Sequence, residues 1–356
     1  RAAQKAATGP TQGQCMSMQA PTQHQHDGHP LPIARYRFSA RALDAVQLPH
    51  YAGSLLRGQF GAALRHLACM TRQPSCTDCP LRSTCPYTRI FEAAAPEQHQ
   101  LQRFSAIPNA YVVEPPPPAL NTMTHANDRW LPAGQKLVFH MVLIGYALEQ
   151  LPLVIVAWQR ALERGLTKSR SRLELEQVQW QDSEGQLIPV WTAAKAHIQP
   201  HAASLNIPPL PTATQALQLH IHTPLRLQHQ GHALPPSKLT PRTLISHLAR
   251  RAALMLEFHA NQTHWGTQVP AAVALAEQVG DERQLRWFDW TRYSSRQQQE
   301  MALGGVVGQW HLHTNADTLE QLWPWLWLGQ WLHVGKNASF GLGGYRLQGL
   351  STDAHA

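Results

Sequence analysis

The chain has 356 residues, of which 43% are hydrophobic and 15% charged, enough apolar material for a packed core. Its formal net charge is +8 and its sequence pI about 9.5, which favours a polyanionic partner without identifying it. The sequence has neither an apolar run of about 18 residues nor a signal-peptide core, so we expect a cytoplasmic protein that does not associate with membranes. Residue 1 is Arg, as expected of a processed piece, a fragment or part of a longer fusion.

The first half of the chain alternates between strand and helix patterns. Residues 1–30 are rich in Gln, Thr, Ala, His and Pro and lack a hydrophobic period, which predicts a disordered arm. Apolar and polar residues alternate as in half-buried strands at 36–42, 135–144 and 172–180. Helical spacing predicts an amphipathic helix over 50–70 and a second helix over 145–164, with Pro152 in its first turns or at a kink.

A Pro-rich stretch at 193–211 predicts a domain boundary, after which the cycle repeats. Strands are expected at 217–227, 286–293, 305–313 and 338–348, and helices at 240–259 and 319–333. The order strand–helix–strand–strand–helix–strand therefore occurs about twice, which is the order of a ferredoxin-like unit. We predict an α+β protein of two tandem ferredoxin-like (RRM-like) domains, residues 31–195 and 212–350, with a Cys-rich insertion in the first.

Four of the five cysteines cluster within one short segment: Cys69, Cys76, Cys79 and Cys85. The middle pair has CxxC spacing, and four thiolates this close can hold zinc in a tetrahedral site or an iron–sulfur cluster. Thiols that pack as small hydrophobic groups are the plainer alternative. The CxxC spacing favours a structural metal, with zinc ahead of iron–sulfur. Four Cys ligands leave no open position, so we expect no catalytic role for this metal.

The most distinctive stretch is HVGKNASFGLGGYRLQ, residues 333–348. Gly341, Gly343 and Gly344 remove side chains from the backbone, and Lys336 and Arg346 add charge, so a ribose–phosphate chain is a plausible ligand. A tight loop between a helix and a strand is the alternative. The GxxxxGK[ST] and GxGxxG phosphate motifs are both missing.

Two further features suit RNA. Arg160–Arg172 is a basic segment that continues beyond a predicted helix end, and within it Lys168, Arg170 and Arg172 are candidate phosphate contacts; a solvated helix terminus is the alternative. His50 and His66 flank the predicted first helix, where a histidine suits general base catalysis but is more often an ordinary surface residue. Trp323, Trp325, Trp327 and Trp331 are expected to pack in the core.

These segments together resemble the CRISPR precursor-RNA processing endoribonucleases of the RAMP superfamily. The C-terminal half carries Trp287, Asp289, Trp290 and HVGKNASFGLGGYRL, and the N-terminal half carries LPHYAGSLLRGQFGAAL and CPYTRIFE. FHMVLIGYA, ERGLTKSRSRLEL and TPLRL are similar to other family landmarks, so that the resemblance covers residues 33–350.

The resemblance implies two ferredoxin-like domains with a basic cleft, and cleavage of CRISPR repeat RNA at the base of a hairpin. It implies a reaction without metal, in which the 2′-hydroxyl attacks the adjacent phosphate to leave a 2′,3′-cyclic phosphate. Family members often use a His at or after the first helix, which implies His66 first and His50 second as the base, with Tyr51 and Lys336 as helpers.

Two other hypotheses remain. One is a non-catalytic RAMP subunit that holds guide RNA among the subunits of a CRISPR effector complex. The other is a metal-stapled adaptor between proteins, which predicts no salt-dependent affinity for RNA.

Overall fold

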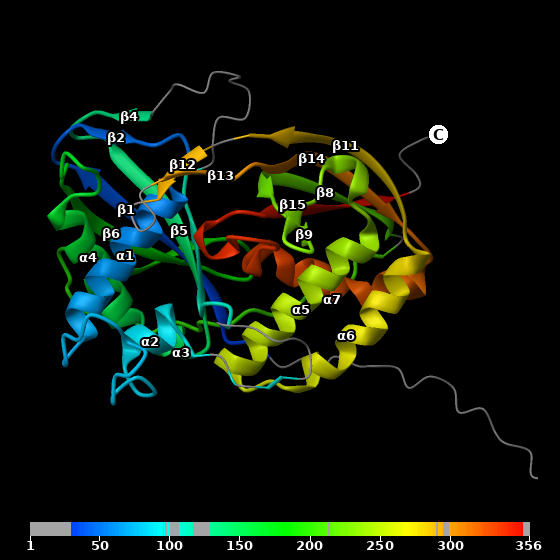
Figure 1. Cartoon of the computed structure of the whole chain (residues 1–356), viewed down its shortest axis with the longest axis horizontal. Helices are drawn as coiled ribbons and strands as arrows, with labels where there is room; N and C mark the ends of the chain where they lie inside the picture. The colour runs from blue at the N-terminus through cyan, green and yellow to red at the C-terminus, as the bar shows by residue number, and fades with distance from the viewer. Residues whose placement is uncertain are drawn as a thin grey trace, which may run out of the picture.

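Two antiparallel sheets, each with helices on one face, lie side by side along the long axis of the computed structural model (Figure 1). The structure describes residues 30–94, 96, 98–99, 107–116, 129–212, 214–289, 291–294 and 299–351, so the predicted disordered arm falls outside the described residues. No helix in this described part is both long enough and apolar enough to cross a membrane.

The N-terminal sheet has the strand order of a ferredoxin-like unit plus one added edge strand. In spatial order it contains β3 (Tyr111–Glu114), β5 (Lys136–Ile144), β1 (Ile33–Ala42), β6 (Leu173–Gln181) and β7 (Leu187–Thr192). Helices α1 (Gly53–Ala68) and α4 (Leu151–Arg164) cover one face. Their aromatic side chains pack on that face, with ring centroids 5.2 Å apart for Phe60 and Trp158 and 4.5 Å for Phe139 and Trp158.

The C-terminal sheet repeats this order. It contains β11 (Gly280–Phe288), β14 (Gly305–His313), β8 (Thr214–Leu225) and β15 (Tyr345–Ser351), again with every neighbouring pair antiparallel. Helices α5 (Pro241–Ala260), α6 (His264–Leu275) and α7 (Ala316–Leu332) form the layer on its core face. The predicted pair of tandem ferredoxin-like domains is therefore confirmed.

Smaller elements complete the described chain. They are α2 (Pro86–Phe91), α3 (Tyr146–Glu149), the pairs β2 (Val46–Leu48) with β4 (Arg129–Leu131), β9 (Gln228–His229) with β10 (His232–Ala233) and β12 (Thr291–Ser294) with β13 (Gln299–Ala302), and the 3₁₀ turns η1 (Pro236–Lys238), η2 (Ala276–Gln278) and η3 (Ala338–Phe340). Residues 69–85, the predicted Cys-rich insertion, lie between α1 and α2.

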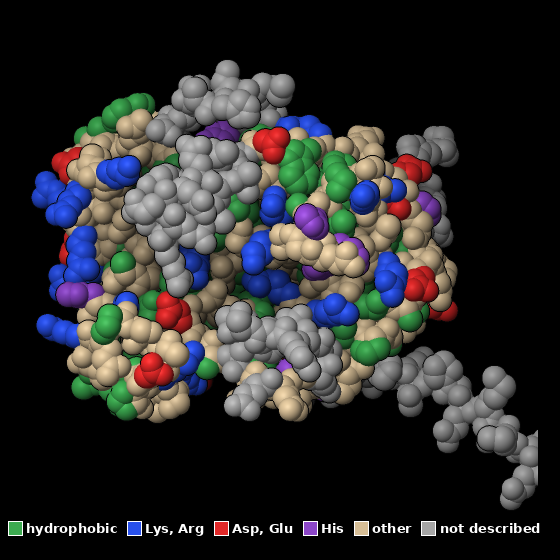
Figure 2. All heavy atoms as spheres, viewed as in Figure 1, with side chains coloured by type: hydrophobic (Ala, Val, Ile, Leu, Met, Phe, Trp, Pro, Cys, Tyr) green, Lys and Arg blue, Asp and Glu red, His purple; other side chains and the backbone are tan. Residues whose placement is uncertain are grey.

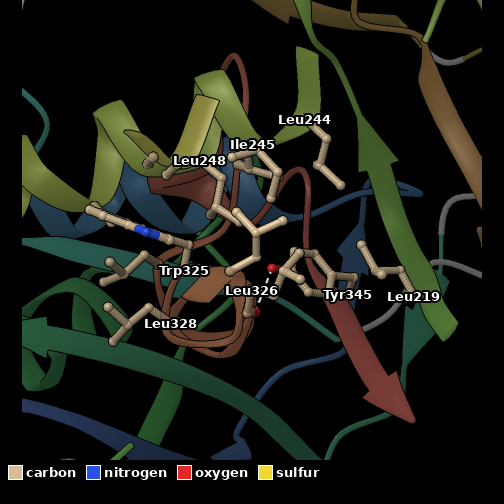
Figure 3. Close-up of a cluster of buried hydrophobic side chains, with 14 of the residues drawn as sticks. Leu219, Leu244, Ile245, Leu248, Trp325, Leu326, Leu328 and Tyr345 are labelled. Atoms are coloured by element: carbon tan, nitrogen blue, oxygen red, sulfur yellow. Dashed lines mark hydrogen bonds between the residues drawn. The ribbon is translucent and has the colours of Figure 1, made fainter. Parts of the chain in front are cut away.

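The C-terminal core is built around the tryptophan-rich helix α7. Figure 3 shows Leu326 of α7 directed toward Leu248 of α5 and Tyr345 of β15, while Trp325 and Leu328 extend away from Tyr345. The Tyr345 hydroxyl donates to the Leu326 carbonyl at 2.7 Å, so this ring is buried without leaving its polar end unpaired. The other tryptophans of α7 pack against the same core, which confirms the predicted packing role.

Proline positions differ from two expectations. The helix predicted over 145–164 is two helices, α3 and α4, which meet at Gln150, and Pro152 lies in the first turn of α4. Pro324 lies inside α7, although proline in a helix is ordinarily confined to the first turn. The carbonyl it leaves without a helical partner belongs to Glu320, an exposed residue that water can reach, which makes the position tolerable.

The two domains share one apolar core. Ile33, Val142 and Ile144, on the N-terminal sheet face opposite α1 and α4, belong to the same buried cluster as Leu248 and Leu328 of the C-terminal domain. Helix α5 contacts β5 and helix α7 contacts β3, so the C-terminal helices cover part of the second face of the N-terminal sheet.

A loop docks the C-terminal domain on the start of α1. Tyr51 is buried, and its hydroxyl donates to the Phe340 carbonyl at 3.0 Å. A Cβ on Gly53 would overlap that same carbonyl oxygen, because the helix backbone lies directly against η3. We call this contact of η3 and its flanking glycines with α1 and β3 the seam.

We expect Gly53→Ala to lower the free energy of unfolding by about 1–3 kcal/mol, because the added methyl group forces backbone against backbone at the seam. Gly58→Ala is the matched control on the same helix, where an added Cβ meets nothing within 4 Å. It should raise stability by about 0.5–1 kcal/mol through helix propensity. Urea unfolding measures both, and equal midpoints for the two variants would contradict this account of the seam.

Candidate nucleic-acid interface

The two open sheet faces carry cations that strand alternation places there. On β1, Tyr36 and Phe38 point into the core, so Arg35 and Arg37 point to the opposite face. On the C-terminal sheet, Leu219 and Ile221 point into the core, and His220 and His222 therefore point away from it. Arg346 of β15 is the register partner of His220.

These faces meet at a buried carboxylate. The Arg35 guanidinium and the His333 Nε2 lie 2.9 Å and 3.0 Å from Glu114 Oε1, and the Arg35 side chain is only 3% exposed. The Arg35 guanidinium also donates to the Gln330 carbonyl at 2.6 Å, at the end of α7. His140, which pairs in register with both Arg37 and Glu114, lies close enough for Glu114 to affect its pKa. We call Glu114, Arg35, His140, His222, His333 and Arg346 the Glu114 cluster.

The charges of this cluster are strongly coupled. Burial alone would raise the pKa of Glu114, but Arg35 and the hydrogen bond from His333 outweigh it and hold the pKa well below its usual range. Burial, together with nearby His333 and Arg346, lowers the pKa of His222 to about 3, so this ring is neutral at neutral pH. Loss of hydration and the charge of Arg35 lower the pKa of the Arg346 guanidinium.

The glycine-rich stretch encloses this cluster. A Cβ on Gly344 would lie 2.7 Å from the His333 ring and 3.1 Å from the His222 ring, and a Cβ on Gly341 would lie 2.6 Å from the Tyr51 hydroxyl. Gly343 has φ +70 and packs against the Val334 carbonyl. The Thr223 hydroxyl donates to the Gly341 carbonyl and accepts from the Gly344 N–H, both at 2.7 Å.

The glycine prediction therefore needs a correction. Gly341, Gly343 and Gly344 are buried by the protein itself, so their backbones do not form an open seat for a ribose–phosphate chain. They are glycines because the two histidine rings, Tyr51 and the loop must pack closely. Lys336 stays exposed on the same loop, as does Arg346 on β15, and RNA contact remains a prediction for these two cations.

The predicted catalytic residues lie at opposite ends of α1. Half-buried His50 precedes the helix and stacks on Phe288 of the C-terminal domain, with ring centroids 5.9 Å apart. Tyr51 is fixed in the seam, and burial, reinforced by Glu114, raises its pKa well above the usual value. Exposed His66 lies in the last turn, about 20 Å from the start of the helix at 1.5 Å per residue. The structure thus brings His50 and Tyr51, but not His66, to the seam.

The second basic set lies on a separate edge. Lys168, Arg170 and Arg172 are exposed in the turn after α4, and Arg172 Nε pairs with Asp44 Oδ2 at 3.2 Å. The Gln59 amide of α1 donates to the Leu166 carbonyl at 3.1 Å, which ties this turn to the middle of α1. Figure 2 shows Lys and Arg side chains on both sides of a hollow between the two halves, and another group at the left edge over α4.

Sequence reasoning missed Arg35, Glu114, His140 and His222. The alternation of β1 could have marked Arg35 as facing away from the core, but its partners lie 79 and 295 residues away along the chain.

Family models match each half of the chain. A model described as the CRISPR-associated endoribonuclease Cas6 matches residues 219–345, and a model described as an N-terminal domain matches residues 31–203. The C-terminal half is therefore similar to the Cas6 endoribonucleases. A search of curated proteins found no match.

Solved structures agree with the Cas6 fold. A Thermus thermophilus Cas6 in a product complex matches with a TM-score of 0.54 at 14% identity, over 89% of this chain and 99% of that one. A partial Cas6-RT-Cas1–Cas2 complex matches with a TM-score of 0.51 at 15% identity, over 93% of this chain and 48% of the other. At these identities the likeness shows the tandem fold alone, and it confirms the fold predicted for this chain.

Replacing the buried carboxylate tests the Glu114 cluster. Glu114→Gln should lower the free energy of unfolding at pH 7 by about 3–5 kcal/mol, because it leaves the Arg35 guanidinium buried without a counter-charge and removes the carboxylate that contacts His333. The folded protein keeps Glu114 ionised below the ordinary pKa of 4.5, whereas the unfolded chain takes up a proton there. The stability that Glu114 supplies is therefore complete above pH 4.5 and is lost progressively below it.

Urea unfolding of the wild type and of Glu114→Gln is measured between pH 7 and pH 3. The difference between their free energies of unfolding should narrow below about pH 4.5. Glu163→Gln is the control, because Glu163 is exposed and pairs only at the surface with Arg160. That control should change stability by under about 1 kcal/mol at any pH. If the difference in free energy of unfolding between wild type and Glu114→Gln stays constant across this pH range, the ionised Glu114 carboxylate does not stabilise the cluster.

Proposed function

We propose that this chain is a Cas6-type, metal-independent endoribonuclease that cleaves precursor CRISPR RNA next to a repeat hairpin. The reaction begins when the 2′-hydroxyl loses its proton and its oxygen attacks the adjacent phosphorus. The bond to the 5′-oxygen breaks, and that oxygen takes a proton. The products are a 2′,3′-cyclic phosphate and a 5′-hydroxyl.

One observation carries the proposal: the open faces of two ferredoxin-like sheets present Arg and His side chains that converge at the seam. A phosphate backbone needs cations along its path, and Arg37, Arg346 and Lys336 supply them from three different elements. The match of residues 219–345 to an endoribonuclease family supplies the reaction class. The repeat RNA is the expected partner, and association with other CRISPR proteins is a further expectation.

His50 is the proposed general base. It is half-buried against Phe288, one residue from Tyr51, and therefore at the boundary between the two domains. A base for the 2′-hydroxyl needs a histidine held in place yet reachable, and stacking on an aromatic ring meets that need. Lys336, on the loop that Tyr51 anchors, is the proposed cation for the crowded phosphate.

The test of the reaction class is incubation of the purified chain with a repeat-containing RNA in EDTA. Cleavage should persist, and the upstream product should end in a cyclic phosphate by mass spectrometry. A single 2′-deoxy nucleotide before the scissile phosphate should abolish cleavage, because it lacks the attacking hydroxyl. Tight binding of intact RNA would instead identify a non-catalytic RAMP subunit, and failure to bind RNA would support the adaptor hypothesis.

A pair of alanine variants separates the two candidate bases. His50→Ala should slow single-turnover cleavage by about 10²–10⁴-fold, the usual effect of removing a general base. His66→Ala is the matched control on the exposed end of α1 and should cleave within a few-fold of wild type. Both should bind RNA normally in a filter assay. The reverse order of effects would return the role of base to His66.

The salt dependence of binding tests the cations. Lys336→Ala and Arg346→Ala should each weaken binding of every RNA sequence, and each should reduce the slope of log affinity against log salt by about 0.7–1. Arg242→Ala is the control, because Arg242 lies at the start of α5 on the core side of its sheet and already pairs with Glu277 at 2.8 Å. An unchanged slope for both test variants would remove this surface from the proposed RNA path.

A further inference from the structure

The predicted cluster of four cysteines surrounds a single cavity at the far end of α1. The cavity has a volume of about 170 Å³, and its lining includes Cys69, Cys76, Cys79 and Cys85, all reduced. None of these four side chains is fully buried, so solvent ions can reach the sulfurs. Four residues spread over 17 positions of sequence thus meet in one place.

Local backbone structure directs each of the four toward this cavity. Cys69 ends α1, with its N–H donating to the Arg65 carbonyl at 2.8 Å, and Cys85 is the residue before α2. Between them, the Cys79 N–H points to the Cys76 carbonyl at 3.4 Å, so the CxxC segment turns back on itself. A tight turn of this kind allows both sulfurs of a CxxC pair to face one ion.

One hydroxyl lies near two of the four sulfurs. The Thr71 hydroxyl lies 3.4 Å from the Cys79 sulfur and 4.0 Å from that of Cys69. Cys76 and Cys85 are each partly buried against the N-terminal core. Among the described residues no three ligand-type side chains are at metal-binding spacing. A change of side-chain rotamer can move each sulfur without moving the backbone.

The segment around the cavity has no core of its own. No residue from 69 to 86 is buried. The helices on either side of this stretch, α1 and α2, both contain buried residues. The Arg65 guanidinium holds it to α1 through the Gln73 and Pro74 carbonyls, at 2.6 Å and 2.9 Å. Exposed segments of this length that lack apolar burial are usually ordered by a cross-link or a metal.

We propose that Cys69, Cys76, Cys79 and Cys85 bind one structural Zn²⁺ as thiolates. Four sulfur ligands suit tetrahedral zinc, and binding releases the protons that the thiols carried. The ion would join the last turn of α1 to the first turn of α2. It takes no part in RNA cleavage, because four protein ligands leave no position for a substrate.

Metal analysis of the full-length purified chain is the direct test. We expect about one zinc per chain, retained through dialysis and lost in each of the four single Cys→Ser variants. Cys15→Ser is the matched control, since Cys15 lies far outside the cluster in sequence, and it should keep its zinc. Replacement by Co²⁺ should give the visible absorption of tetrahedral cobalt thiolate.

A second measurement uses the wild-type protein and so does not depend on variants that fold. Removing the metal with a strong chelator should expose the bonds after Arg72 and Arg82 to trypsin, because both lie in the stapled segment. Adding back Zn²⁺ should restore protection. Four thiols that react with Ellman's reagent as fast as Cys15, two disulfides, or iron with sulfide in place of zinc would each overturn the proposal.

Discussion

A buried carboxylate links the two domains, because it contacts a side chain from each of them. Glu114 stands at the end of β3 in the N-terminal domain, and the two cations in contact with it come from β1 and from the residue after α7. Both nitrogens of the His333 ring face oxygen acceptors, Glu114 on one side and the Leu342 carbonyl on the other. Each ring nitrogen thus faces an oxygen of a different segment, so the carboxylate, the His333 ring and the glycine-rich loop depend on one another.

The same arrangement explains why cations collect where the domains meet. Each ferredoxin-like sheet buries one face under its own helices, and alternation sends every second residue of β1 and β8 to the other face. Apolar residues on that second face, such as Val142 and Ile144, are covered by α5 and α7. The remaining part carries Arg37 and His220 and stays partly open to solvent. A basic surface between two domains is thus a consequence of how the sheets are packed.

Much of the fold could be predicted from the sequence, because it follows from local patterns. Helix α5 spans Pro241–Ala260, close to the predicted 240–259, and β1 follows its alternation. Helix α6 and strand β7 were missed. Helix α6 contains Pro270 and lacks a clear polar face, and β7 is an edge strand with Pro189 inside it, so neither has a strong period. Helix α1 was predicted, but the sequence did not show which of its two ends lies at the seam.

The site was harder to predict, because its contacts join residues far apart in the chain. A glycine-rich run beside cations is the pattern of an anion seat, yet three of its glycines make room for side chains of the protein itself. Their partners, Tyr51, His222 and His333, are common residue types without a local signature. The exposed cations of the run, Lys336 and Arg346, could by contrast be predicted from the sequence, because their charge is evident without knowledge of their contacts.

The core shared between the domains bears on how such a chain can be divided. Ile33, Val142 and Ile144 are covered only because α5 and α7 are present in the same molecule. Separating the halves at the linker would expose apolar residues on the sheet of the first half and apolar helix surfaces on the second. Exposing either surface to water is unfavourable. The halves are two domains by topology, but because they share one buried cluster we expect them to fold and unfold as a single unit.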